Sequence, residues 1–189
     1  MKTDILIVGS GCAGLYAALN LPGDKQITII TKDIVEHSDS FLAQGGMCML
    51  KSEDDYDSYF EDTMKAGHYE NDPKSVEVMI RSSVDIVNDL VKYGADFHRE
   101  PDGSLSYTKE GAHSHHRIIF HEDVTGKEIT STLLHNVEKL PNVTIYEHVT
   151  MVDILCKDNC CYGWEIDIDE GTMDYYRSLG GELGKEITS

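Results

Sequence analysis

The sequence has few basic residues for its acidic content. Lysine and arginine together number 16, against 34 aspartate and glutamate residues, which gives the 189-residue chain a formal charge of −18. A negative field of this size repels nucleic-acid phosphates and anionic membrane surfaces. We therefore expect neither nucleic acid nor a membrane as a partner.

Long hydrophobic runs are also missing. No apolar stretch approaches the roughly 20 residues of a membrane-spanning helix. The opening MKTDILIVGSGCAG holds one strand-length apolar run that breaks at Gly9, whereas a secretion signal needs a longer run and a cleavage site of small residues. The five cysteines are an odd number, which favours reduced thiols over a disulfide framework. These features predict a cytoplasmic location.

The first 31 residues predict a βαβ unit. An apolar strand is expected over residues 4–8, and apolar residues then recur at helical spacing from Leu15 to Leu21, until Pro22. A β-branched run follows at residues 27–31. Because such units have a right-handed crossover and parallel strands, the expected fold class is α/β, with a Rossmann-like parallel sheet.

The rest of the chain offers one strong helix signal and several weaker ones. The clearest helix should begin at Pro73 behind an N-cap residue and end near Gly94. Residues 33–51 lack a steady period and are expected to form an extended loop, with a helix starting near Asp54. An Asp-Gly pair at 102–103 predicts a hairpin turn.

The last third should contain a helix followed by strands. The helix is expected from about residue 125 to 140, where a proline follows it. Strands are then expected at 143–146, 149–156 and 162–168. Successive strands of this kind predict a β-meander beside the parallel sheet.

The segment Gly9-Ser10-Gly11-Cys12-Ala13-Gly14 matches the pattern G-x-G-x-x-G between the first expected strand and helix. In this pattern the first glycine makes a tight turn, the second lets backbone approach a pyrophosphate, and the third allows the helix to pack on the strand. The helix N-terminus then offers partial positive charge to the diphosphate. The context favours a dinucleotide site over a glycine-rich turn without a ligand.

The end of the second strand bears on which dinucleotide is bound. NAD-binding units usually carry an acidic residue there, which bonds a ribose hydroxyl. Here the place holds Thr31-Lys32, with Asp33 one step further along. The sequence therefore weakens the case for NAD.

The next segment, Ser38-Asp39-Ser40-Phe41-Leu42-Ala43-Gln44-Gly45-Gly46, resembles the A-Q-G-G loop of the succinate dehydrogenase, fumarate reductase and L-aspartate oxidase flavoprotein family. The resemblance implies FAD as the cofactor, with this loop around the flavin. The residues implied to bind FAD are Gly9, Ser10, Gly11, Cys12, Ala13, Gly14, Lys32, Asp39, Ser40, Phe41, Leu42, Ala43, Gln44, Gly45 and Gly46.

Family members that bind FAD covalently carry a histidine four residues before the alanine of this loop. That position is Asp39 here, so the resemblance implies non-covalent FAD. His37 lies two residues earlier and would need a shifted loop to reach the ring. A covalent link through His37 remains the minor alternative.

A second segment is similar to L-aspartate oxidases in particular. Residues 108–118, TKEGAHSHHRI, resemble their R-E-G-x-H-S-x-R-R-I, and residues 123–129, DVTGKEI, match the D-x-T-G-x-E-I that follows. The resemblance implies oxidation of L-aspartate to iminoaspartate for quinolinate and NAD synthesis. Oxygen or fumarate would accept the electrons, and quinolinate synthase is a candidate partner.

The same segment supplies the candidate catalytic residues. The resemblance implies that Glu110 orients the substrate by binding the ammonium group of L-aspartate. Succinate and fumarate lack this group. His113, His115 and Arg117 are candidate donors to the flavin or to substrate carboxylates, and the alternative is an ordinary polar loop. A metal site that includes His121 is not expected, because no cysteine or carboxylate has matching spacing.

The resemblance fades after about residue 160. The family's A-x-G-G element has at most a relic in Gly180-Gly181, and its capping domain and proton-transferring arginine would lie beyond residue 189. We therefore expect residues 1–189 to be the N-terminal part of an FAD-binding domain, with an atypical tail at 160–189 and no activity alone. The alternatives are a non-catalytic nucleotide-binding fragment and a fumarate reductase-like or ketosteroid dehydrogenase-like flavoprotein. The E-G-x-H-S context of Glu110 argues against the latter.

Overall fold

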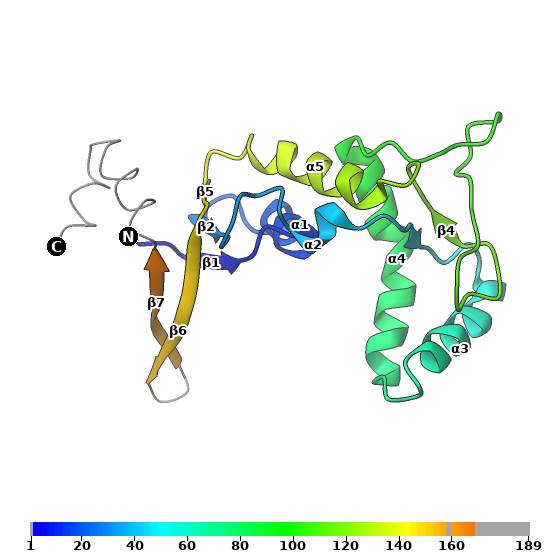
Figure 1. Cartoon of the computed structure of the whole chain (residues 1–189), viewed down its shortest axis with the longest axis horizontal. Coiled ribbons are helices and arrows are strands. Elements are labelled where there is room, and N and C mark those ends of the chain that lie inside the picture. The colour runs from blue at the N-terminus through cyan, green and yellow to red at the C-terminus, as the bar shows by residue number, and fades with distance from the viewer. Residues whose placement is uncertain (1, 158–159, 169–189) are drawn as a thin grey trace. The chain divides into compact units, whose positions relative to one another are not determined.

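The computed structural model describes residues 2–157 and 160–168 (Figure 1). Two compact units are present, one built on residues up to 39 and from 133 onward, the other on residues 40–132. The elements in chain order are β1 (Ile5–Val8), α1 (Cys12–Asn20), β2 (Ile27–Ile30), α2 (Asp39–Leu42), β3 (Met47–Cys48), η1 (Glu53–Asp55), α3 (Tyr56–Ala66), α4 (Pro73–Tyr93), β4 (Ile118–Ile119), α5 (Thr125–Val137), β5 (Val143–Tyr146), β6 (Val149–Lys157) and β7 (Cys160–Ile168).

The first unit is built on a parallel sheet. Its strands lie in the order β1-β2-β5, with Ile27 of β2 opposite Ile5 on one side and Val143 on the other. All four residues of the central strand β2 are buried, as expected for a parallel strand covered on both faces. Helix α1 contacts β1 and buries Leu15 and Ala18. The predicted βαβ unit and α/β fold class are thus confirmed.

The strands after residue 140 differ in part from the expected meander. Strands β6 and β7 form an antiparallel hairpin in which Val149 lies opposite Ile168. Strand β5, however, belongs to the parallel sheet, because the long helix α5 precedes it and a long crossover is what a parallel connection needs. Strand β7 covers the start of the segment expected to be atypical. Residues 169–189, including Gly180-Gly181, lie outside the described residues.

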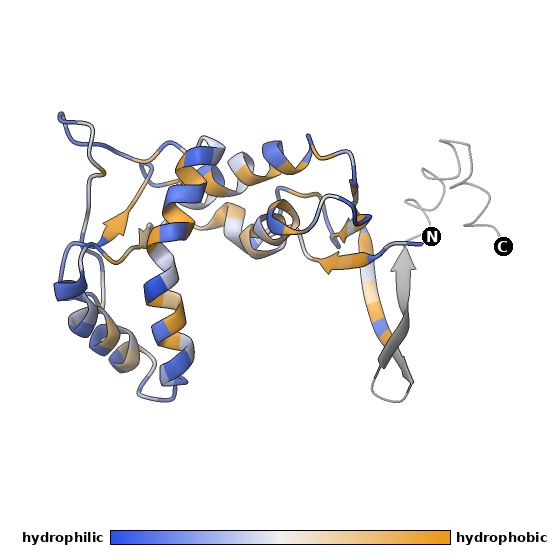
Figure 2. Cartoon of the chain, turned by 180° about the vertical axis from the view of Figure 1, so that it is seen from behind, coloured by the Kyte–Doolittle hydropathy of each residue, from blue (hydrophilic) through white to orange (hydrophobic). Residues whose placement is uncertain are grey.

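The second unit contains the longest described helix, α4. The carboxylate of the N-cap Asp72 accepts a hydrogen bond from the Ser75 amide at 2.7 Å, Pro73 occupies the first turn, and Gly94 ends the helix. Both ends therefore lie where the sequence predicts them. Figure 2 shows hydrophobic and hydrophilic residues side by side along α4, as expected for an amphipathic helix.

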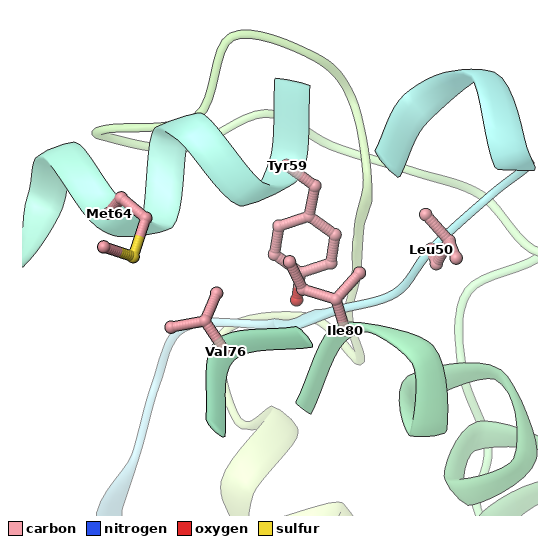
Figure 3. Close-up of a cluster of buried hydrophobic side chains, with 5 residues drawn as sticks. All are labelled: Leu50, Tyr59, Met64, Val76 and Ile80. Carbon is pink, nitrogen blue, oxygen red and sulfur yellow. The ribbon is translucent and has the colours of Figure 1, made fainter. Parts of the chain in front are cut away.

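The core of the second unit joins α3 to α4. Figure 3 shows the cluster, with Tyr59 of α3 pointing toward Ile80 of α4; its members are Leu50, Tyr59, Met64, Val76 and Ile80. The buried Ser83 is the polar member of this region, because its hydroxyl accepts from the Leu50 amide at 3.0 Å and donates to the Ile80 carbonyl at 2.6 Å. Met79, which lies on the same helix as Ile80, is 46% exposed.

The segment 33–51 is more ordered than the expected extended loop. It holds the short helix α2 and the strand β3, and β3 pairs antiparallel with β4, so that Met47 lies opposite Ile119. Two-residue strands paired across such a separation leave no periodic signal in the sequence. The hairpin predicted at residues 102–103 is present as an antiparallel bridge between Arg99 and Leu105. None of the helices within the described ranges combines the length and apolar character that a membrane crossing requires.

Candidate cofactor and substrate site

The glycine motif forms the turn between β1 and α1. The amide of Gly9 donates to the Ile30 carbonyl at 2.8 Å, and the φ of Gly9 is +110°, a conformation that side chains oppose. A β-carbon on Gly14 would overlap the Gly9 carbonyl oxygen, so the helix packs as closely as the motif requires. Gly11 is the N-cap of α1, whose first turn carries no acidic side chain. The partial positive charge of this helix end therefore meets no opposing carboxylate in its own first turn.

Ser10 fastens this turn to the end of β2. Its side chain is buried, and its hydroxyl oxygen lies 3.1 Å from both the Thr31 hydroxyl and the Val35 carbonyl. Because a carbonyl can only accept, the Ser10 hydroxyl donates to Val35 and accepts from Thr31. Thr31, which stands where NAD-binding proteins carry an acidic residue, therefore has a structural partner. The neighbouring Lys32 is exposed.

Two residues that precede the predicted flavin loop, Asp33 and His37, are hydrogen-bonded to each other. His37 Nδ1 lies 3.1 Å from the Asp33 carboxylate, in an exposed hydrogen bond. This hydrogen bond, together with one from the Ile34 amide, lowers the pKa of Asp33. Asp39, the residue in place of the covalent histidine, begins helix α2. His37 thus has a local partner in the structure.

The A-Q-G-G loop and the second motif segment lie together in the second unit. Ala43, Gln44, Gly45 and Gly46 are exposed, and the Gly126 amide donates to the Ala43 carbonyl at 3.0 Å. Glu110 Oε2 lies 3.6 Å from the place that a β-carbon on Gly45 would occupy. The structure therefore places the carboxylate predicted to orient substrate beside the loop predicted to hold the flavin.

Arg117 is the largest fully buried side chain among the described residues. Its Nε and Nη2 form a bidentate pair with Asp55, at 3.0 and 2.7 Å. Its Nη1 lies 2.6 Å from Asp62 Oδ2, and its Nη2 also donates to Ser58 at 2.7 Å. Bidentate arginine–carboxylate pairs are among the stronger hydrogen-bonded contacts in proteins. The network ties the 110–117 segment to η1 and α3.

The two histidines predicted as donors contact the same guanidinium. Nδ1 of His113 and Nδ1 of His115 each lie 3.2 Å from Arg117 nitrogens. Arginine can only donate, so Nδ1 of a neutral His113 accepts, and its proton is on Nε2, which lies 3.1 Å from Cys48 Sγ. Burial, and then the positive charge of Arg117, lower the pKa of His113. His113 is thus neutral, with Nε2 as its donor.

The two aspartates of the network are held ionised. Burial of Asp62 opposes its ionisation, but hydrogen bonds from the Ser114 amide, the Ser114 hydroxyl and Arg117 outweigh it and lower the pKa of Asp62 to about 2. Burial likewise opposes ionisation of Asp55, and bonds from Arg117 and Ser58 outweigh it and lower its pKa. Neither aspartate was predicted as a site residue, because nothing in the sequence separates these two from the other acidic residues.

A cavity of about 520 Å³ lies beside this network in the second unit. Its lining includes Cys48, Tyr59, Asp62, Met79, Ser83 and His113. Burial raises the pKa of the Cys48 thiol and of the Tyr59 hydroxyl, so both groups are protonated at neutral pH. Among the side chains that the structure describes, no three His, Cys, Asp or Glu are grouped as metal ligands.

The parallel sheet, the glycine turn and the uncapped helix N-terminus define a dinucleotide-binding α/β protein. The family of the FAD binding domain matches residues 4–179, and the chain belongs to this family. The resemblance inferred from the motifs and the expectation of FAD as the cofactor are thereby confirmed. The match also extends beyond residue 160, where the motif resemblance fades.

Individual relatives agree with this assignment. The chain is 44% identical over 176 residues to an L-aspartate oxidase of Clostridium perfringens, covering 93% of the chain and 40% of the relative. It is 40% identical over 163 residues to the L-aspartate oxidase of Clostridium acetobutylicum, covering 86% and 38%. An E. coli quinol fumarate reductase structure superposes with a TM-score of 0.84 at 25% identity, covering 92% of the chain and 30% of that structure. The chain thus spans about 40% of the length of these curated relatives.

Proposed function

We propose that this chain forms the FAD-binding part of an L-aspartate oxidase, which converts L-aspartate to iminoaspartate with oxygen or fumarate as the electron acceptor. The observation that supports this proposal most directly is the Glu110 carboxylate beside Gly45 of the A-Q-G-G loop. The similarity to two clostridial L-aspartate oxidases supports it independently.

The described residues fit FAD in both units. In the first, Gly9–Gly14 make a tight turn with close backbone packing in front of a helix end, which suits a diphosphate, and Lys32 is exposed at the end of β2. In the second, the short helix α2 leads into the exposed residues Ala43–Gly46, whose two glycines carry no side chain that would keep a flat ring from the backbone. We propose these two segments and Lys32 as the FAD contacts, without a covalent link, since Asp39 replaces the histidine. When bound, FAD supplies the acceptor for the two electrons that aspartate loses.

Glu110 gives the proposed site its selectivity. A carboxylate beside the flavin loop can pair with an ammonium group and orient the substrate Cα–H. A dicarboxylate without an amine gains nothing from this contact and meets a like charge instead. We therefore assign Glu110 to substrate orientation, with His113 and His115 as neighbouring candidate donors.

A chimera tests the substrate assignment. Residues 4–179 of this chain would replace the matching segment of the C. perfringens enzyme, and flavin bleaching would be followed anaerobically with L-aspartate or succinate. Aspartate should bleach the flavin, and Glu110→Gln should lower kcat/KM for aspartate about 10- to 100-fold, the cost of losing a charged hydrogen bond. The matched control is the exposed Glu138→Gln. Bleaching by succinate but not by aspartate would overturn the proposal in favour of a fumarate reductase-like flavoprotein.

The 189-residue chain by itself tests the cofactor part. We expect it to bind FAD weakly and its flavin not to be reduced by aspartate, because the chain spans only about 40% of the length of the related L-aspartate oxidases and catalysis draws on contacts from a whole active site. A flavin titration followed by anaerobic addition of aspartate measures both properties. Stoichiometric tight binding together with reduction would contradict this expectation.

The proposed reaction also suggests a partner enzyme, and the sequence suggests a location. Iminoaspartate is a reactive imine, so an enzyme that consumes it at once, such as quinolinate synthase, is the proposed partner. We propose the cytoplasm as the location, from the odd number of cysteines in the sequence.

A further inference from the structure

The buried Arg117 has no donor left for a substrate. Arginine carries five N–H groups. The contacts of Nε, Nη1 and Nη2 with Asp55, Asp62, Ser58, His113 and His115 account for all of them. The side chain is also 0% exposed. Arg117 therefore cannot act at the site by touching a ligand.

The turn between Glu110 and Arg117 is held in an unfavourable conformation. Ala112 has a φ of 53°, which a residue with a β-carbon adopts only when its surroundings impose it. Two residues further along, α3 holds this turn through Ser114. Asp62 accepts from both the amide and the hydroxyl of Ser114 at 2.7 Å, and Asp62 in turn pairs with Arg117.

The Asp62 carboxylate thus joins the Arg117 guanidinium to the backbone amide of Ser114 in this turn. On the other side of this turn, Glu110 reaches the flavin loop at Gly45. We propose that Arg117 is a positioning residue: clamped between Asp55 and Asp62, it fixes the turn that holds Glu110 beside Gly45. This inference rests on the substrate-orienting role proposed for Glu110. It adds two residues, Asp55 and Asp62, on which the geometry of that role depends.

Nuclear magnetic resonance on the 189-residue chain without FAD tests the inference. Wild type should show a nuclear Overhauser effect between the Glu110 γ-protons and Gly45 α-protons, and a single His113 tautomer with the proton on Nε2. Arg117→Lys keeps the charge but loses the planar fork. In this variant the Overhauser effect should vanish, His113 should show both tautomers, and Ser114 amide exchange should rise about tenfold or more.

Two further variants keep the test decisive. Arg117→Met combined with Asp55→Asn and Asp62→Asn leaves no uncompensated buried charge, so it should fold while losing the clamp. The control is Arg81→Lys, because Arg81 is an exposed arginine that bonds Glu77 and Glu53. In this control all three signals should stay as in wild type.

The amides of α4 separate positioning from general stability. If Arg117 positions the turn, α4 amide exchange should stay within about twofold of wild type while Ser114 exchange rises. An unchanged Overhauser effect in the folded clamp variants, or equal acceleration of Ser114 and α4, would overturn the inference. Failure of the chimera to oxidise aspartate would overturn only the proposed function, since none of these signals needs FAD or substrate.

Discussion

The amide of Gly126 donates to the carbonyl of Ala43 at 3.0 Å. This bond joins two motifs that are far apart in the sequence, the A-Q-G-G loop and the T-G that begins α5. A β-carbon on Gly126 would overlap the carbonyl oxygens of Ser40 and Ala43. The start of α5 therefore supports the backbone of the proposed flavin loop directly.

Gly126→Ala should push this loop away from α5. Overpacking of this kind costs about 1–3 kcal/mol, because the backbone oxygens must move. Urea unfolding followed by circular dichroism should show the loss. The control is Gly23→Ala, since a β-carbon there meets no atom within 4 Å. Equal unfolding midpoints for Gly126→Ala and wild type would contradict this prediction, because the loop would then move without loss of stability.

Asp62 should make stability depend on pH in acid. Its pKa is about 2 in the folded chain, against about 3.9 in an unfolded one, so the unfolded state binds more protons between these values. The stabilisation is complete above about pH 4 and is lost as pH falls toward 2.

Asp62→Asn should therefore be less stable than wild type at pH 6, by a margin that shrinks toward pH 2. Urea unfolding at several pH values measures this margin, with the exposed Asp54→Asn as the control. A margin that does not change with pH would contradict the assignment of this pH dependence to Asp62.

Ile80 should carry much of the stability of the second unit. It is 0% exposed at the centre of the cluster in Figure 3, and replacing a buried isoleucine by alanine costs about 2–5 kcal/mol. Val78 lies on the same helix but is 61% exposed, so Val78→Ala should change stability by less than about 0.5 kcal/mol. Chemical denaturation of both variants measures this difference. Similar losses of unfolding free energy for the two variants would contradict the central place of Ile80 in the core.

The 189-residue chain should self-associate. Strand β1 is an edge strand of the described parallel sheet, its residues are only partly buried, and Val8 is 52% exposed. Open apolar edges pair with other chains, and a lysine at the edge opposes this. Sedimentation equilibrium should show association that rises with concentration and weakens in Val8→Lys. A monomer at the highest concentration reached would refute this expectation.

Local signals in the sequence determined much of the architecture. The βαβ unit follows from an apolar run, a glycine pattern and a second apolar run within a short stretch, and the ends of α4 follow from Asp72, Pro73 and Gly94. Each signal involves residues that are neighbours along the chain. Backbone conformation there depends mostly on those neighbours, so the prediction needs no knowledge of the rest of the molecule.

Only the tertiary structure decided how distant segments pair. The bond between Ser10 and Thr31, the pairing of β3 with β4, and the place of β5 in the parallel sheet each join residues that no local pattern links. The clearest case is Arg117. The sequence holds 34 acidic residues, and nothing local distinguishes Asp55 and Asp62 as its partners. That choice is made by packing, because a buried guanidinium is tolerated only where folding brings enough acceptors to satisfy it.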